Sequence, residues 1–195
     1  MSAADAVKLI HDEAVIAVNS SSGLNCPDAI LKAIGERFER EGHPRNITSL
    51  HAIASGDMFG IRGVDHIARK GLLGRILAGS YPSGPSSSEP PEIWKLLLAN
   101  EIPAYNIPSG IMLDMYREAA AKRPGVITKV GLETFVDPDQ RGCAMNAKAA
   151  AHPIVRKIMF EGEDWLFFPA IAPQVGIIRG SYADEKGNIA FDQEG

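Results

Sequence analysis

Two turns rich in serine and glycine are the segments of this sequence that could hold a ligand through backbone amides. Residues 20–23 (SSSG) follow an apolar run at 14–18, and residues 108–110 (PSG) follow another at 103–107. Each turn leads into a segment whose apolar residues recur at helical spacing. Amides at such a strand-to-helix turn can bind a phosphate, or they can polarise the oxygen of an acyl group. An ordinary turn capped by serine is the structural alternative, and spacing alone leaves it open.

The known phosphate and metal motifs are missing. A dinucleotide fingerprint needs G-x-G-x-x-G, whereas the stretch 15–30 has one glycine, and a Walker motif needs G-K-[ST]. The five histidines show no ligand spacing such as HExxH, so we expect them at the surface or at helix caps. Cys26 follows the first turn with no histidine at a fixed relation to it, so we expect a small buried thiol. We therefore expect no metal site.

A third candidate turn lies in the stretch GLETFVDP at 131–138, which carries a glycine, a carboxylate and a hydroxyl. It follows an apparent strand at 126–130. In an open α/β sheet, ligands bind outside the carboxyl ends of the strands. We predict that this turn and the turns at 20–23 and 108–110 lie at one edge of a mainly parallel sheet and line one cleft.

The elements that must position these turns alternate along the chain. Apolar runs separated by helical segments of about a dozen residues imply parallel βαβ units. Helices are expected at 3–10, 28–41, 65–69, 91–100 and 110–122, and strands at 14–18, 47–53, 72–78, 103–107, 126–130, 154–160, 165–168 and 175–179. Residues 82–91 form the clearest loop, and a hairpin with a second strand at 188–192 is expected near the end. The sequence thus predicts an α/β fold with a strand-rich C-terminal part.

Composition narrows the function classes. The 195 residues carry a net charge of -4, with 45% hydrophobic and 23% charged residues, which is typical of one globular domain. Without a basic stripe we expect no nucleic-acid partner. No apolar window reaches about 20 residues, so we expect no membrane span. The two cysteines do not form a disulfide framework, and the sequence shows no signal peptide, so we expect a cytoplasmic protein.

Several longer stretches resemble one protein family. The sequence is similar to the N-terminal half of the acetate and propionate CoA-transferases, within family I of the CoA-transferases. The resemblance covers nearly the whole chain, and its specific signals are GLETFVDP and RGSYADEKGNI. It is carried by the strand, turn and helix at 15–34, PRNITSLHA at 44–52, RGVDHIARKGLLGR at 62–75, AYNIPSG at 104–110, GLETFVDP at 131–138 and the stretch at 167–192.

The resemblance implies a three-layer α/β/α fold, of the kind shared with sugar-phosphate isomerases, and a single N-terminal, α-type domain over 1–195. It implies ping-pong transfer of CoA between short-chain carboxylic acids, through an acyl-glutamyl anhydride and a glutamyl-CoA thioester. The nucleophilic glutamate belongs to the family's second half, so this chain would hold no catalytic residue and Glu133 is not the nucleophile. Acyl-CoA and a carboxylate would be substrates, with no bound cofactor. The acyl-pocket or oxyanion candidates are Ser21, Ser22, Gly23, Ser109 and Gly110, and the cleft-loop candidates are Gly131, Glu133, Thr134 and Phe135.

The sequence departs from the family pattern at two places. Ser109 stands where the family has a glutamine that can donate to the acyl oxygen, and Cys143 and Ala144 replace a glycine and a cation. The serine at 109 and the missing second half favour the alternative of a non-catalytic binding or assembly module on the same scaffold. A sugar-phosphate isomerase-like enzyme is a third possibility, but no carboxylate and lysine pair in the sequence supports it.

The resemblance also implies partners. We expect a second half or β subunit, no activity from the isolated chain, and self-association into a homo-oligomer. The residues expected to be left uncovered are Phe167, Phe168, Ile171 and Ile189.

Overall fold

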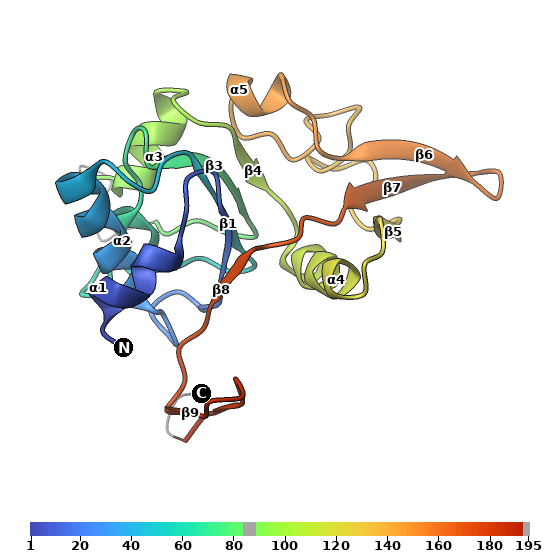
Figure 1. Cartoon of the computed structure of the whole chain (residues 1–195). Coiled ribbons are helices and arrows are strands. Elements are labelled where there is room, and N and C mark those ends of the chain that lie inside the picture. The colour runs from blue at the N-terminus through green and yellow to red at the C-terminus, as the bar shows by residue number, and fades with distance from the viewer. Residues whose placement is uncertain (84–88, 193–195) are drawn as a thin grey trace.

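A five-stranded parallel sheet forms the centre of the computed structural model, which describes residues 1–83 and 89–192 (Figure 1). The strands lie in the order β4-β3-β2-β1-β8. Their bounds are β1 (Val15–Val18), β2 (Ile47–His51), β3 (Leu73–Ala78), β4 (Ala104–Asn106) and β8 (Val175–Ile177). Since all five run in parallel, the loops that follow them leave from one edge.

Helices connect the strands. They are α1 (Ala3–Ala6), the 3₁₀ helix Val7–Leu9, α2 (Asp28–Glu41), the 3₁₀ helix Gly63–His66, α3 (Glu92–Leu98), α4 (Ser109–Ala120) and α5 (Ala147–Ala150). The longest, α2, buries Leu31 and Ile34 on one face, as helical spacing of apolar residues requires. It ends at Gly42, whose φ of 72° is left-handed and whose amide caps Phe38 O.

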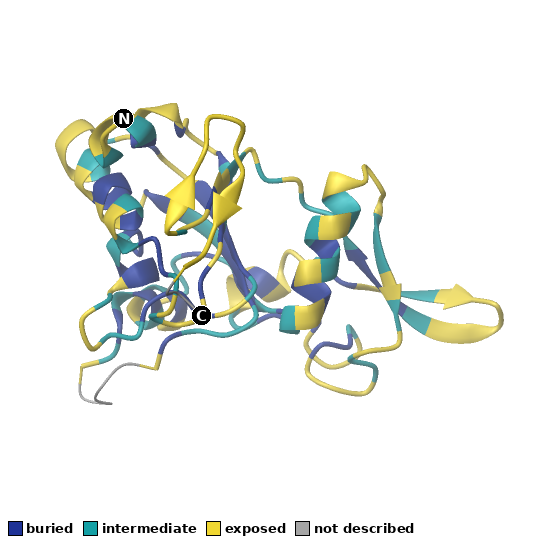
Figure 2. Cartoon of the chain, turned by 90° about the horizontal axis from the view of Figure 1, so that it is seen from below, coloured by how far each residue is buried: buried dark blue, intermediate teal, exposed yellow. Residues whose placement is uncertain are grey.

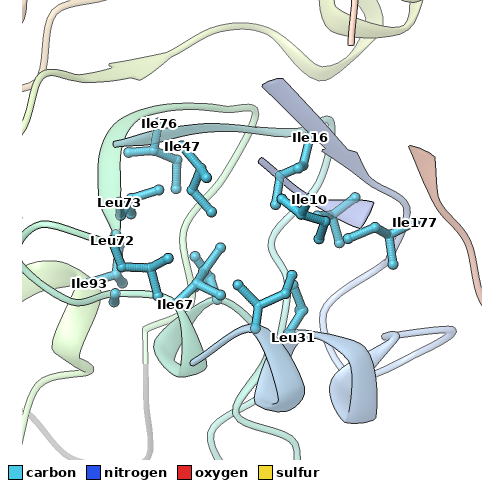
Figure 3. Packing of buried hydrophobic residues seen from close by; sticks show 14 of the residues in the cluster. Ile10, Ile16, Leu31, Ile47, Ile67, Leu72, Leu73, Ile76, Ile93 and Ile177 are labelled. Carbon is cyan, nitrogen blue, oxygen red and sulfur yellow. The ribbon is translucent and has the colours of Figure 1, made fainter. Parts of the chain in front are cut away.

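Two cores lie on opposite faces of the parallel sheet. One packs α2 and α3 against Ile16, Ile47 and Ile76 (Figure 3). The other packs α4 against residues such as Leu50 and Leu77. Because side chains alternate along a strand, consecutive residues such as 76 and 77 enter different cores. The resulting helix, sheet and helix layers confirm the predicted three-layer α/β fold.

A second, antiparallel sheet completes the strand-rich C-terminal part. It has the order β5-β7-β6, from β5 (Gly125–Thr128), β6 (Arg156–Phe160) and β7 (Glu163–Pro169). The hairpin of β6 and β7 turns at Glu161 and Gly162, both with positive φ, and it projects from the body (Figure 1). A small hairpin, β9 (Tyr182–Ala183) and β10 (Ile189–Ala190), follows β8 and is exposed throughout (Figure 2).

Several sequence predictions need correction. The segment 126–130 does not join the parallel sheet, because β5 pairs in antiparallel fashion with β7. Phe167 and Phe168 are buried rather than left uncovered, while Ile189 is 37% exposed. The expected strand at 188–192 shortens to β10, and part of the expected loop at 82–91, residues 84–88, lies outside the described residues.

Some absences hold for the part of the chain that the structure describes. No helix there is long and apolar enough to cross a membrane. Likewise, residues 1–83 and 89–192 contain no cluster of three histidine, cysteine, aspartate or glutamate side chains suited to a metal ion.

Candidate functional site

The turn after β1 is held firmly against the loop after β2. The Ser22 amide donates to Ala54 O at 2.7 Å, and the Gly56 amide donates to Ser22 O at 2.9 Å. The Ser20 hydroxyl adds a bond to Ala54 O at 3.2 Å. These bonds extend the pairing of β1 and β2 beyond the strand ends, so the turn is rigid although Ser22 has a left-handed φ of 58°.

Most amides of this turn are already used. Ser21 and Leu24 bond each other through both amides at 2.9 Å, and the Ser22 amide goes to Ala54 O. Within residues 1–83 and 89–192, the Gly23 amide has no hydrogen-bond acceptor. A Cβ at Gly23 would lie 2.5 Å from Asp57 Oδ2, so a larger residue there would require the Asp57 side chain to move. Of the three candidates in this turn, only Gly23 therefore offers a backbone donor to a ligand.

The turn after β4 opens helix α4. The first helical bond runs from the Met112 amide to Pro108 O at 3.0 Å. The amides of Ser109, Gly110 and Ile111 precede this ladder, as at every helix start, and carry the positive end of the helix dipole. Ser109 is half-buried and Gly110 is exposed. This turn therefore presents several amides and one hydroxyl at the carboxyl edge.

Gly79 is the point at which the loops after β2, β3 and β4 meet. A Cβ at this position would lie 2.1 Å from Ala52 O and 2.3 Å from Ser109 Oγ. Immediately after it, Ser80 Oγ accepts from the Ala54 amide at 2.9 Å. Since Ala54 O also accepts from Ser20 and Ser22, one hydrogen-bonded network joins the turn at 20–23 to Ser80, and the adjacent Gly79 packs closely against Ser109.

The loop 131–138 follows a strand of the other sheet. It follows β5 of the antiparallel sheet, so the prediction that all three turns share one edge of the parallel sheet was wrong for this turn. Glu133, Thr134 and Phe135 are exposed, and Gly131 O accepts from the Thr134 hydroxyl at 2.7 Å. The loop is nevertheless linked to the parallel sheet: Phe135 O accepts from the Cys143 amide at 3.3 Å, and Cys143 O accepts from the amide of Asn106, whose side chain donates to Gly79 O.

Asp137 fixes the conformation of this loop. Its buried carboxylate accepts the amides of Glu133 at 2.9 Å and Asp139 at 3.0 Å, and it pairs with Lys157 at 3.0 Å. Desolvation raises the pKa of Asp137, but these hydrogen bonds and the lysine charge outweigh it and hold the pKa below its usual value. The loop is thus fastened to β6 by an ionised carboxylate.

Cys143 and Ala144, the second departure from the family pattern, lie in the protein interior. Cys143 O accepts from the Asn106 amide at 2.9 Å, and Ala144 bridges Tyr105 in antiparallel fashion. Both residues are buried, and burial raises the pKa of Cys143 to about 12. The segment that holds the two substitutions therefore lines the outer edge of β4 instead of facing solvent.

The two remaining groups of interest near the carboxyl edge are both buried. Cys26 lies 3.4 Å from Ser55 Oγ, and burial raises the pKa of its thiol, which confirms the prediction of a buried cysteine. His51, expected at the surface or at a cap, is 1% exposed. Its Nε2 is 2.7 Å from Ser49 Oγ, its Nδ1 has no partner in the described residues, and burial lowers its pKa to about 4. The position of His51 within the apolar run at 47–53 could have predicted its burial.

Comparisons with known proteins agree along the whole chain. A family model described as Coenzyme A transferase matches residues 1–195. Caffeate CoA-transferase of Acetobacterium woodii is 37% identical over 195 residues, which are 100% of this chain and 36% of that protein. Acetate CoA-transferase YdiF of Escherichia coli (strain K12) is 32% identical over all of this chain and 35% of its own length.

Solved structures show the same fold. The acyl-CoA transferase YdiF apoenzyme from Escherichia coli O157:H7 superposes with a TM-score of 0.88 at 31% identity, over 100% of this chain and 36% of that one. Glutaconate coenzyme A-transferase from Acidaminococcus fermentans, at 17% identity and a TM-score of 0.70, supports the fold alone. The chain spans about a third of the length of these two curated relatives.

Proposed function

The chain belongs to the coenzyme A transferase family, and we propose that it forms one wall of the acyl site in an enzyme that moves CoA between short-chain carboxylic acids. The observation that carries the proposal is the junction at Gly79. It packs Ser109 at the start of α4 closely against Gly79, whose neighbour Ser80 belongs to the hydrogen-bonded network of the turn that holds Gly23.

This edge suits an acyl oxygen better than a phosphate. A phosphate site uses several convergent amides, whereas the turn after β1 keeps only the Gly23 amide available. The amides of Ser109 and Gly110, helped by the helix dipole, can stabilise the negative charge that develops on a carbonyl oxygen. Losing one such donor can cost about 3 kcal/mol of transition-state stabilisation.

Covalent catalysis would come from another part of the enzyme. We propose that a second half or β subunit supplies a glutamate, which attacks the acyl-CoA carbonyl and releases CoA as an acyl-glutamyl anhydride forms. The CoA thiolate then attacks the glutamyl carbonyl, the carboxylate leaves, and the glutamate carries CoA as a thioester. Glu133 is a poor candidate for this role, because its loop follows β5 of the antiparallel sheet and the family resemblance assigns the nucleophile to the second half. In this proposal residues 1–195 form one α-type domain, and the isolated chain is inactive.

A chimera tests the proposal directly. The chain replaces the matching part of caffeate CoA-transferase, and CoA exchange between acetyl-CoA and propionate is followed by chromatography. We expect exchange by the chimera and none by the 195-residue chain alone. Trapping with hydroxylamine should capture an enzyme-bound CoA thioester during turnover.

Variants of the chimera separate the possible roles. Ser109→Pro removes one helix-start amide and should lower kcat, whereas Glu133→Ala should leave kcat within about threefold of the parent chimera. Exchange by the isolated chain that Glu133→Ala abolishes would show that the nucleophile is in this chain. A folded chimera without exchange would favour the alternative, a binding or assembly module.

A further inference from the structure

A groove of about 650 Å³ lies at the amino edge of the parallel sheet, opposite the edge that carries Gly79. Its polar side chains come from the starts of three neighbouring strands and from the loop before β6. The lining residues that matter for a ligand are Glu13, Thr48, Arg75, Pro103, Tyr105 and Ile154. None of these residues belongs to the candidate acyl site.

Arg75 is the one cation in the lining with a permanent charge. It is half-buried on β3, and within the described ranges its guanidinium makes no hydrogen bond and no ion pair. The charge on Arg75 also acts on the Tyr105 phenol. Burial raises the pKa of Tyr105, and the charge on Arg75 opposes that rise. A half-buried guanidinium has lost part of its hydration, so an anion that pairs with it recovers free energy.

A second donor faces the same groove. Thr48 on β2 is the direct cross-strand neighbour of Arg75, so both side chains lie on one face of the sheet. The residue is 8% exposed, and in the part of the chain that the structure describes its hydroxyl has no hydrogen-bond partner. Its oxygen is not one of the buried unsatisfied side-chain atoms of the described residues, so it is open to the groove and available to a ligand. A guanidinium and a hydroxyl side by side match the two oxygens of a carboxylate.

The rest of the lining narrows the ligand. Pro103, Pro153 and Ile154 provide apolar surface, and the Tyr105 hydroxyl is occupied by a bond to His152 O at 2.7 Å. Among the described residues, Glu13 makes no ion pair with Arg75 although it lines the same groove, and its charge opposes a multiply charged anion. One cation, one acid and an apolar wall fit a singly charged organic acid better than a phosphate.

We propose that this amino-edge groove is a binding site for a small monocarboxylate, held by Arg75 and Thr48 and separate from the acyl site. The carboxylate accepts two bonds from the guanidinium and one from the hydroxyl, and a short alkyl tail contacts the proline and isoleucine side chains. Binding at this groove can be measured without catalysis, so the proposal does not depend on the proposed transferase function.

The test is an NMR titration of the 195-residue chain that follows the Arg75 Nε–Hε signal. Butyrate should shift this signal saturably at concentrations up to about 100 mM, while inorganic phosphate should not. Arg75→Gln should weaken butyrate binding, monitored at backbone amides around the groove, by about tenfold or more, and Thr48→Val by about threefold. Glu13→Gln should tighten binding, because it removes the opposing charge.

A matched control removes a cation elsewhere. Lys122→Gln, at the exposed end of α4, changes net charge as Arg75→Gln does and should leave affinity within about twofold of the parent. Thermal unfolding monitored by circular dichroism verifies that each variant is folded. Absence of a saturable shift, equal affinity in folded Arg75→Gln and the parent, or saturation by phosphate instead of butyrate would each overturn the proposal.

Discussion

Replacing Gly79 with alanine tests whether the loops after β2, β3 and β4 meet as tightly as the structure shows. The added Cβ would lie 2.1 Å from Ala52 O and 2.3 Å from Ser109 Oγ. Real carbon–oxygen contacts are more than about 3 Å, so one loop must move by about 1 Å. The nearer contact is backbone, which cannot rotate away as a side chain would.

The cost follows from overpacking. We expect Gly79→Ala to lower the free energy of unfolding by about 2 kcal/mol, within the usual range of about 1–3 kcal/mol. In urea this corresponds to a midpoint about 1 M lower, measured by circular dichroism at 222 nm. Adding Ser109→Ala removes one of the two close contacts and should restore only part of the loss, which a double-mutant cycle measures.

Gly110 provides the matched control one residue beyond Ser109. A Cβ at Gly110 meets no atom within 4 Å, and the residue lies in the first turn of α4. We expect Gly110→Ala to be neutral or to stabilise by up to about 1 kcal/mol. If the Gly79→Ala and Gly110→Ala variants unfold at the same urea concentration as the parent, the loops can move to accommodate the added methyl group. The close contact at Gly79 would then not fix the geometry of the site.

Three further predictions concern buried groups. Burial lowers the pKa of His51 from its ordinary value of 6.5 to about 4, so the unfolded chain binds more protons than the folded chain between these pH values. The free energy of unfolding should therefore fall by about 3 kcal/mol from pH 7 to pH 4. His51→Gln should flatten this part of the plot of stability against pH. Lys157→Gln leaves the buried Asp137 carboxylate without its cation and should lower the urea midpoint of unfolding, whereas an unchanged midpoint would show that the pair behaves as a surface one. Cys26 and Cys143 should not react with Ellman's reagent in the native chain at pH 8, because both thiols are buried and have raised pKa values. In urea both thiols should react. Rapid labelling of the native chain would contradict their burial.

Local signals in the sequence were strong enough to predict most elements of the parallel sheet. The apolar spacing at 28–41 defines α2, and Gly42 ends it through a left-handed conformation that other residues adopt only at a cost. Alternating strands and helices imply parallel pairing, because a helical crossover brings the next strand back in the same direction. These features depend on neighbours within a few residues, so the chain itself specifies them.

Pairing partners were decided by the tertiary structure. The run at 126–130 has the same apolar pattern as the parallel strands, yet β5 pairs with β7, which lies some forty residues later in the sequence. Phe167 and Phe168 point to opposite faces of the second sheet, and both are covered. No local pattern states which distant strand or loop will cover a side chain.

For the candidate sites too, the sequence predicted one part and the tertiary structure decided the other. The sequence identified the turns at 20–23 and 108–110, since small residues after a strand allow a tight turn before a helix. It could not show that Ala54 O occupies the Ser22 amide, or that Arg75 and Thr48 are left without partners among the described residues. Hydrogen-bond satisfaction depends on which distant atoms lie within about 3 Å of a group, and only the folded chain fixes those distances.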